Sequence, residues 1–251
     1  MVLEYIIAAT VLVSLISLIG ILILQVRRGW ADRLLFFFVS FAAGTFLGAA
    51  FLDLLPEALE ACNAQNALYY TLGGILVFFI IEKVVHWHHH HSMHKKSEMH
   101  GIKPLGYLNL IGDGLHNFFD GVAIAASFMA SMPTGITTTI AVIFHEIPQE
   151  IGDYTVLIYS GFKPKRALAL NLLSALSAVL GALAFYYFAA FVENFAQIAL
   201  AFTAGMFIYM ATTDLVPELH KEVDPGKSAL QLIFILAGIG TIWAVATFLG
   251  G

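Results

Sequence analysis

Eight long runs of apolar residues constrain the fold of this chain more than any other feature. Each run is close to the roughly 20 residues that an α-helix needs to cross a bilayer, and far longer than the roughly 9 to 11 of a barrel strand. The chain is 59% hydrophobic, with a mean hydropathy of +0.84. We therefore expect an all-α integral membrane protein, a single transmembrane domain over residues 1–251, with spans near residues 3–26, 33–55, 67–85, 105–130, 134–160, 165–191, 195–217 and 228–249.

The basic residues predict the orientation, because positively charged loops stay on the cytoplasmic side. Every Lys and Arg falls in or beside the first, third, fifth or seventh connection, so these connections are expected to be cytoplasmic and both termini extracytoplasmic. A multi-pass plasma membrane protein, as in a bacterial inner or cell membrane, fits this compact chain. A net charge of -5 and the absence of a basic tail give no support for a nucleic-acid partner. The basic residues are Arg27, Arg28, Arg33, Lys83, Lys95, Lys96, Lys103, Lys163, Lys165, Arg166, Lys221 and Lys227.

The second and seventh runs contain an internal repeat. Residues 41–57 align without gaps to residues 202–218. These two spans cross the membrane in opposite directions, which predicts an inverted repeat of the first and last three helices. The repeat places an acidic pair near each membrane face, which suits a cation pathway. Alternatively, the Asp-x-x-Pro-Glu motif only ends a helix at the membrane–water interface. The outer pair is Asp53 and Glu57, and the inner pair is Asp214 and Glu218.

The fourth and fifth runs each carry a polar stripe within an apolar helix. At about 100° per residue, each stripe lies within an arc of roughly 100° to 140°. Insertion of an acidic residue at a helix centre costs about 2.5 to 3.5 kcal/mol, so these residues are expected to face each other or water rather than lipid. The stripes consist of Asp113, His116, Asn117 and Asp120 in one helix, and His145, Glu146, Gln149, Glu150 and Asp153 in the other.

Clustered carboxylates without Lys or Arg need a counter-charge, and a divalent cation supplies it. Imidazole together with carboxylate suits zinc, iron or manganese, and histidine favours zinc. Pro148 removes a backbone donor within the fifth helix and frees a carbonyl group near these side chains. The alternatives are a buried hydrogen-bond network between helices and a proton relay.

The segments His-Asn-Phe-Phe-Asp-Gly at 116–121 and His-Glu-Ile-Pro-Gln-Glu-Ile-Gly-Asp at 145–153 resemble signatures of the ZIP (Zrt/Irt-like) metal transporters. The resemblance covers nearly the whole chain. It implies a three-plus-two-plus-three bundle, a homodimer, and import of zinc into the cytoplasm through a metal site between helices 4 and 5.

By position, the resemblance implies a paired metal site made of His116, Asn117, Asp120, His145, Glu146 and Gln149, with Asn171 as a further contributor. Gln149 departs from the pattern, because relatives have His or Glu there. The adjacent Glu150 is therefore either a ligand or a relay. We expect Asp113 and Asp153 to belong to the release path on the cytoplasmic side.

The third connection, residues 86–103, is rich in histidine. Such tracts bind zinc or nickel loosely. The segment could catch or sense metal at the cytoplasmic face, or be a disordered linker or an engineering remnant. Its imidazoles are His86, His88, His89, His90, His91, His94 and His100.

The favoured function is transport of divalent metal ions, with zinc as the bound and transported ion and iron, manganese or cadmium as alternatives; the protein is then not an enzyme. An intramembrane metalloenzyme of zinc or di-iron type is the runner-up, because His145-Glu146-x-x-Gln149 is similar to a zinc-protease motif. However, Gln149 stands where that motif requires a second histidine. A metal-sensing scaffold is the third class.

Overall fold

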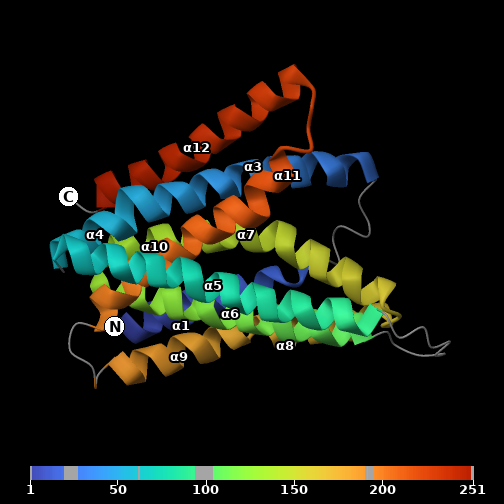
Figure 1. Ribbon diagram of the computed structural model, residues 1–251, viewed down its shortest axis with the longest axis horizontal. Helices are drawn as coiled ribbons and strands as arrows, with labels where there is room; N and C mark the ends of the chain where they lie inside the picture. Colours follow the sequence, from blue (N-terminus) through green and yellow to red (C-terminus); the bar gives the residue numbers. More distant parts are fainter. Residues whose placement is uncertain are drawn as a thin grey trace.

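The structure is a computed structural model that describes residues 2–19, 28–61, 63–93, 104–189, 191 and 195–249. Within these residues the chain is helical almost throughout and contains no strand. The helices lie alongside one another in a single bundle (Figure 1). The protein is therefore an all-α membrane protein, as the apolar runs predict.

The described residues form eight helical rods, one for each apolar run. Five rods are single helices: α1 (Val2–Ile16), α5 (Ala64–Met93), α6 (Pro104–Ala130), α7 (Met132–Tyr159) and α12 (Pro225–Leu249). The other three are interrupted: α3 (Arg28–Ala49) with η1 (Ala50–Leu54) and α4 (Leu55–Ala61); α8 (Pro164–Ala175) with α9 (Ser177–Ala189); and α10 (Phe195–Met210) with η2 (Ala211–Leu215) and α11 (Val216–Leu219).

Five of these rods are long and apolar enough to cross a membrane by length and composition alone. The remaining three rods do not meet these criteria of length and hydropathy. The described helix α1 has 15 residues, and α6 and α7 carry the polar stripes that lower their mean hydropathy. The five rods cover Leu35–Glu60, Ala64–Lys83, Pro164–Ala189, Phe195–Leu219 and Pro225–Leu249.

Helix α5 continues further than the apolar run predicts. Its backbone is helical through Met93, so the first part of the histidine-rich segment extends a helix. The sequence has no glycine or proline between Gly74 and Gly101 to end that helix. The side chains from His86 to His91 are not described, and His94 and His100 lie outside the described residues.

The internal repeat has a structural counterpart in the two π-helical segments, η1 and η2. They occupy matching positions of the aligned sequences, and in each the backbone N–H of the next residue donates to the carbonyl five residues earlier: Leu55 to Ala50, and Val216 to Ala211. A proline follows at 56 and 217, and each lacks the N–H that would continue the α-helical ladder. Helices α3 and α10 run in opposite directions (Figure 1), so the repeat is inverted within the bundle.

Glycines bring the two halves of the repeat into close contact. Helix α3 packs along α12, and α10 packs along α5. A Cβ atom at Gly44 of α3 would collide with the Ile235 carbonyl of α12, and one at Gly205 of α10 would collide with the Thr71 carbonyl of α5. Since Gly44 and Gly205 are aligned in the repeat, the two helix crossings are equivalent. Small residues at such crossings let helix backbones approach closely within a membrane.

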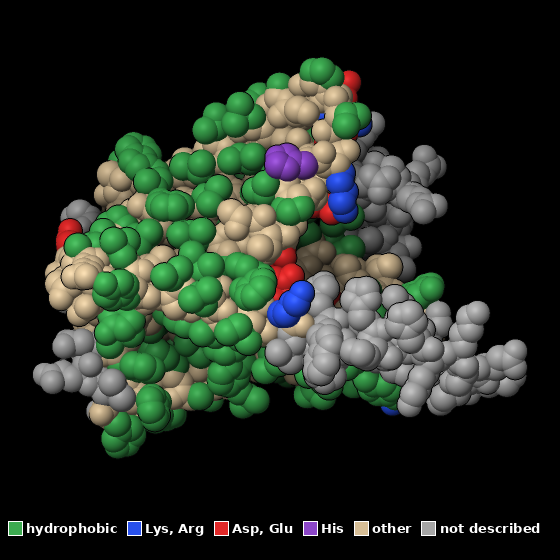
Figure 2. Space-filling view, viewed as in Figure 1, with side chains coloured by type: hydrophobic (Ala, Val, Ile, Leu, Met, Phe, Trp, Pro, Cys, Tyr) green, Lys and Arg blue, Asp and Glu red, His purple; other side chains and the backbone are tan. Residues whose placement is uncertain are grey.

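One end of the bundle collects the chain segments that carry basic residues. The beginnings of α3, α6, α8 and α12 and the ends of α5, α7 and α11 all lie at the right of Figure 1. Lys83, Lys163, Lys221 and Lys227 belong to these segments. In the space-filling view, basic and acidic side chains gather at a hollow on this side, whereas hydrophobic side chains cover most of the remaining visible face (Figure 2).

Candidate metal centre

Four side chains of α6 and α7 converge at the centre of the bundle. His116 and Asp120 lie one turn apart on α6, and His145 and Glu146 are consecutive on α7. One ligand atom from each residue lies within 4.8 Å of the others. Asp120, His145 and Glu146 are buried, and the side chain of His116 is 19% exposed.

The spacing of these atoms fits a tetrahedral metal ion. The two Nε2 atoms of His116 and His145 are 3.1 Å apart. Asp120 Oδ2 lies 3.5 Å and 3.4 Å from them, and Glu146 Oε1 lies 3.8 Å and 3.3 Å from them. Zinc bonds of about 2.0 to 2.1 Å place tetrahedral ligands about 3.3 Å apart. The four atoms therefore require little movement to bind one zinc ion.

The carboxylates of this group lack hydrogen-bond donors. Both side-chain oxygens of Asp120 and both of Glu146 are buried and accept no hydrogen bond from the described residues. Buried polar atoms are almost always satisfied, and an uncompensated buried charge is strongly unfavourable. The chemistry of the group thus fits a cation bound between two imidazoles and two carboxylates.

The surroundings hold His145 in position. Its Nδ1 lies 3.4 Å from the carbonyl oxygen of Ala141, one turn earlier on α7. Donation from Nδ1 leaves the lone pair of Nε2 directed toward the other three ligands. The ring also packs against Phe46 of α3, with ring centroids 4.4 Å apart. Packing and hydrogen bonding therefore both orient the imidazole toward the centre.

The other sequence-predicted ligands lie outside this tight group. Asn117 donates to Asp113 on the same helix, with Nδ2 2.8 Å from Oδ1. Glu150 accepts a hydrogen bond from Asn171 of α8. Gln149 is half-buried and faces open space. Their assignment as metal ligands stays a prediction.

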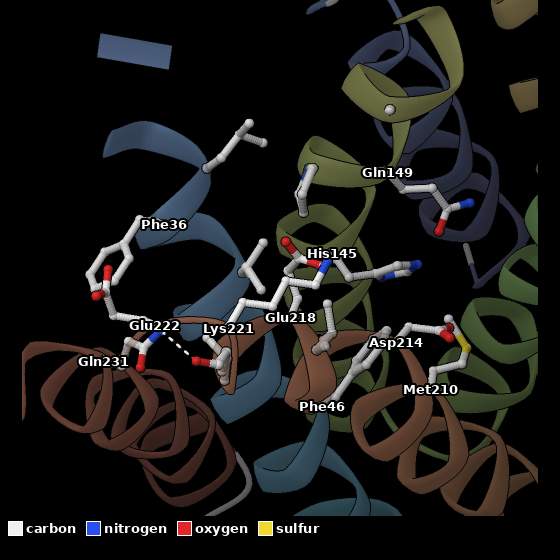
Figure 3. Close-up of a pocket in the computed structure, with 16 residues that line it drawn as sticks. Phe36, Phe46, His145, Gln149, Met210, Asp214, Glu218, Lys221, Glu222 and Gln231 are labelled. Carbon is white, nitrogen blue, oxygen red and sulfur yellow. Dashed lines mark hydrogen bonds and ion pairs between the residues drawn. The ribbon is translucent and has the colours of Figure 1, made fainter. Parts of the chain in front are cut away.

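A wide cavity connects the metal centre to one end of the bundle. It has a volume of about 770 Å³ and reaches from His145 and Gln149 to Asp214 and Glu218. In Figure 3, Gln149 and His145 extend from α7 into this space, and Asp214 faces them from the other side. Both members of the predicted inner acidic pair thus line the route to the centre. His145 of the metal centre lines the same cavity.

Ion pairs surround the mouth of the cavity. Lys221 bonds to Glu218, and Lys227 Nζ lies 2.9 Å from Glu222 Oε2. The hydrogen bond from Lys227, together with backbone donors, lowers the pKa of the half-buried Glu222 carboxyl below its usual value. Glu222 therefore stays negatively charged at neutral pH, and it contributes to an acidic mouth that attracts cations.

The opposite end of the bundle is closed around Asp53. This carboxylate is 8% exposed, and it accepts hydrogen bonds from the hydroxyl groups of Thr134 and Thr137 at the beginning of α7. Its repeat partner, Asp214, is exposed in the cavity. Equivalent residues thus sit in a closed environment at one end and an open environment at the other. Glu57, the other member of the outer pair, is half-buried on α4.

Two aligned aromatic rings pack beside the metal centre, where Phe46 also contacts His145. Phe46 and Phe207 are aligned in the repeat, and they stack on each other with centroids 4.4 Å apart and an interplanar angle of 21°. Both rings are fully buried. Contact between aligned residues places the pseudo-two-fold axis of the repeat between these rings.

This asymmetry predicts unequal chemical accessibility of the two aligned aspartates. In a Cys62→Ser background, we expect Asp214→Cys to react readily with a charged, water-soluble thiol reagent, because the cavity admits water. Asp53→Cys should react at least about 10-fold more slowly, because it is packed against α7. The measurement is the labelling rate of purified protein in detergent, with Glu218→Cys as an exposed reference. Equal rates for the two aspartate positions would contradict the closed end.

Some residues around the site were not anticipated from the sequence. Thr134 and Thr137 belong to a threonine-rich stretch whose contact with Asp53 of η1 has no local signal in the sequence. Asn109 donates to Asp153, with Nδ2 2.9 Å from Oδ1, and its position four residues before Asp113 would have extended the polar stripe of α6. The hydroxyl of Tyr209 donates to Glu82 Oε2 at 2.5 Å, a pairing between helices α10 and α5, which are far apart in the sequence.

The fold and this centre define a helical membrane protein with a buried histidine and carboxylate cluster. The chain belongs to the ZIP family: the family described as ZIP Zinc transporter matches residues 2–100 and 86–246. Members of this family are transporters rather than enzymes, which argues against the metalloenzyme alternative.

Curated relatives carry names that agree with the family. The chain is 38% identical to Zinc transporter ZIP13 of Pongo abelii over 80% of its own length and 63% of that protein. It is 32% identical to Zinc transporter zipt-7.2 of Caenorhabditis elegans over 97% of its length and 65% of that protein. With mouse Zinc transporter SLC39A7, identity is 30% over 96% of the chain and 69% of the relative. The chain thus spans about two thirds of the length of these relatives.

Proposed function

We propose that this protein transports divalent metal ions, principally zinc, across the membrane through the centre between α6 and α7. The observation that carries this proposal is the group of two imidazoles and two carboxylates at tetrahedral spacing, at the inner end of a cavity that is open at one end of the bundle. Membership of the ZIP family and the names of the relatives support zinc as the ion. Iron, manganese and cadmium are the competing ions.

We further propose that transport runs into the cytoplasm and that the open cavity faces the cytoplasm. The distribution of basic residues supports this orientation, because Lys221 lines the cavity, Lys227 pairs with the lining residue Glu222, and positive charge is retained inside the cell. Both termini are then extracytoplasmic and the plasma membrane is the location. The closed environment of Asp53 corresponds to an inward-open conformation.

The three-plus-two-plus-three grouping and the homodimer follow from family resemblance and belong to the same proposal. The reciprocal packing of α3 on α12 and of α5 on α10 supports the grouping, since each pair joins the first three rods to the last three. Asp113, Asp153 and Asn171 belong to the release path, because they lie beside the centre toward the beginning of α6.

The test is uptake of radioactive zinc by proteoliposomes containing the purified protein. We expect saturable accumulation above that of empty liposomes, and competition by unlabelled zinc at lower concentrations than by iron, manganese or cadmium. Zinc binding without accumulation would indicate the metal-sensing scaffold instead. If iron, manganese or cadmium competed more strongly than unlabelled zinc, that metal would be the principal transported ion instead of zinc.

A further inference from the structure

A groove on the outside of the bundle runs between α6 and the rod formed by α8 and α9. It has a volume of about 410 Å³, and most of the side chains that line it are aliphatic. Helices α6 and α8 both begin at the end of the bundle where the basic residues gather (Figure 1). The lining includes Ile111, Gly114 and Leu115 of α6, Leu170 and Leu173 of α8, and Ser177 of α9.

The surface of this groove is almost purely apolar. Ile111 on one wall is 61% exposed, and Leu173 on the other wall is 65% exposed. The two serine hydroxyls in the lining already donate to carbonyl oxygens of α6. Ser174 donates to Leu110 at 3.0 Å, and Ser177 donates to the carbonyl one turn further along α6. A hydrocarbon chain can therefore fill the groove without leaving a polar group unsatisfied.

One end of the groove carries an arginine and two aromatic rings. Arg166 lies one turn before Leu170, on the face of α8 that lines the groove, and Tyr107 lies one turn before Ile111 on the corresponding face of α6. The guanidinium carbon of Arg166 is 5.4 Å from the centroid of the Phe162 ring. That ring in turn lies 5.2 Å from the ring of Tyr107. The three side chains thus connect α6 to α8 where the groove reaches the basic end of the bundle.

The positive charge at this end of the groove is not neutralised by nearby acids. The sequence contains no Asp or Glu between Asp153 and Glu193. Lys163, Lys165 and Arg166 are all exposed, and within the described part of the chain the ion pairs of basic side chains belong to the lysines at the mouth of the large cavity. An apolar groove that ends at uncompensated positive charge is complementary to a molecule with a hydrocarbon chain and an anionic head.

We propose that an anionic phospholipid binds here, with an acyl chain in the groove between α6 and α8 and its phosphate at Arg166. The guanidinium group presents several N–H donors in a plane, which suits phosphate oxygens. Tyrosine rings are enriched at the headgroup level of membranes, which agrees with the exposed position of Tyr107 beside this end. The inference goes beyond the proposed function and does not rest on it, because none of these residues belongs to the metal centre.

The neighbouring lysine separates a bound lipid from general attraction to anionic membranes. Lys165 is exposed, as Arg166 is, and it carries the same charge. However, it lies about 140° around α8 from Leu170, whereas Arg166 lies about 40° from Leu170. A lipid seated in the groove therefore contacts Arg166 and not Lys165. General attraction to an anionic surface would depend on both residues equally.

The first experiment measures lipid binding by native mass spectrometry of the purified protein in detergent. We expect saturable binding of phosphatidylglycerol, tighter than that of phosphatidylcholine with the same acyl chains. Arg166→Gln should weaken phosphatidylglycerol binding by about 5-fold, the effect of one basic residue at a membrane surface. Lys165→Gln is the matched control and should change binding by less than about 2-fold. Both positions are exposed, and thermal unfolding verifies that both variants are folded.

The second experiment locates the acyl chain by fluorescence quenching. Tryptophan is introduced as Leu173→Trp at the groove, or as Leu236→Trp at a similarly exposed position of α12, after the three native tryptophans are replaced by phenylalanine. Phosphatidylglycerol with brominated acyl chains should quench the Leu173→Trp protein at about 5-fold lower lipid concentration than the Leu236→Trp protein. Adding Arg166→Gln should remove that difference.

Three results would overturn the lipid site. The first is equal binding of phosphatidylglycerol and phosphatidylcholine. The second is an equal effect of Arg166→Gln and Lys165→Gln, as expected for general attraction to anionic lipid. The third is release of the lipid by inorganic phosphate together with equal quenching at the two tryptophan positions, which would indicate a phosphate site that does not use the groove. Lipid binding is measured without transport, so failure of zinc uptake would overturn the proposed function alone.

Discussion

Replacement of His145 by alanine is expected to reduce zinc uptake into proteoliposomes by about 100-fold or more. The imidazole is 3% exposed, and its Nε2 lies 3.1 Å from that of His116. Its loss removes one of four ligands and leaves His116 as the remaining imidazole of the group beside Asp120 and Glu146. Zinc then has too few ligands to replace its hydration shell inside the bundle.

The matched control for this variant is His220→Ala. His220 is exposed at the end of α11 and lies outside the four-residue centre, so its removal should change uptake by less than about 2-fold. Size-exclusion chromatography and thermal unfolding of both variants in detergent separate loss of transport from loss of fold. Wild-type uptake by a folded His145→Ala protein would show that the centre between α6 and α7 is not used.

Replacement of Gly74 by alanine is expected to destabilise a helix crossing of the inverted repeat. A Cβ atom at Gly74 of α5 would collide with the backbone carbonyl of Phe202 in α10, whereas a Cβ atom at Gly73 would meet no atom within 4 Å. Backbone cannot move aside without separating the two helices. We expect Gly74→Ala to lower the free energy of unfolding by about 1 to 3 kcal/mol, measured by thermal unfolding in detergent.

The neighbouring glycine supplies the control on the same helix. Gly73→Ala should leave stability unchanged or raise it by up to about 1 kcal/mol, because alanine favours helix more than glycine does. The repeat allows a second comparison, since Gly238→Ala on α12 would collide with the Phe41 carbonyl and Gly240→Ala would not. If Gly74→Ala were as stable as Gly73→Ala, and Gly238→Ala as stable as Gly240→Ala, the helix crossings would not be close-packed.

The sequence predicts the helices and the polar stripes well, because both depend on local periodicity. All eight apolar runs are helical in the residues described. The stripe residues of α6 and α7 face each other, since five carboxylates cannot face lipid. The boundaries are less predictable: α5 extends into the histidine-rich segment, and the rod from Pro164 to Ala189 is interrupted at Leu176, between the end of α8 and the beginning of α9.

Other features depend on contacts between distant helices and carry no local signal. Asp53 and Asp214 have nearly the same sequence context, yet one is buried against Thr137 and the other is exposed in the cavity. The difference arises because the bundle is open at only one end. Similarly, the chain shows nine polar residues in two stripes, but only tertiary packing selects His116, Asp120, His145 and Glu146 as the compact group.

The account depends on one claim, that imidazoles of α6 and α7 bind the transported ion together with carboxylates. X-ray absorption at the zinc edge, on purified protein loaded with one equivalent of zinc, tests it most directly. We predict two imidazole nitrogens and carboxylate oxygens at about 2.0 to 2.2 Å, and loss of the imidazole signal in the His116→Ala/His145→Ala variant. A spectrum that shows no imidazole, or one that the double variant leaves unchanged, would contradict the claim.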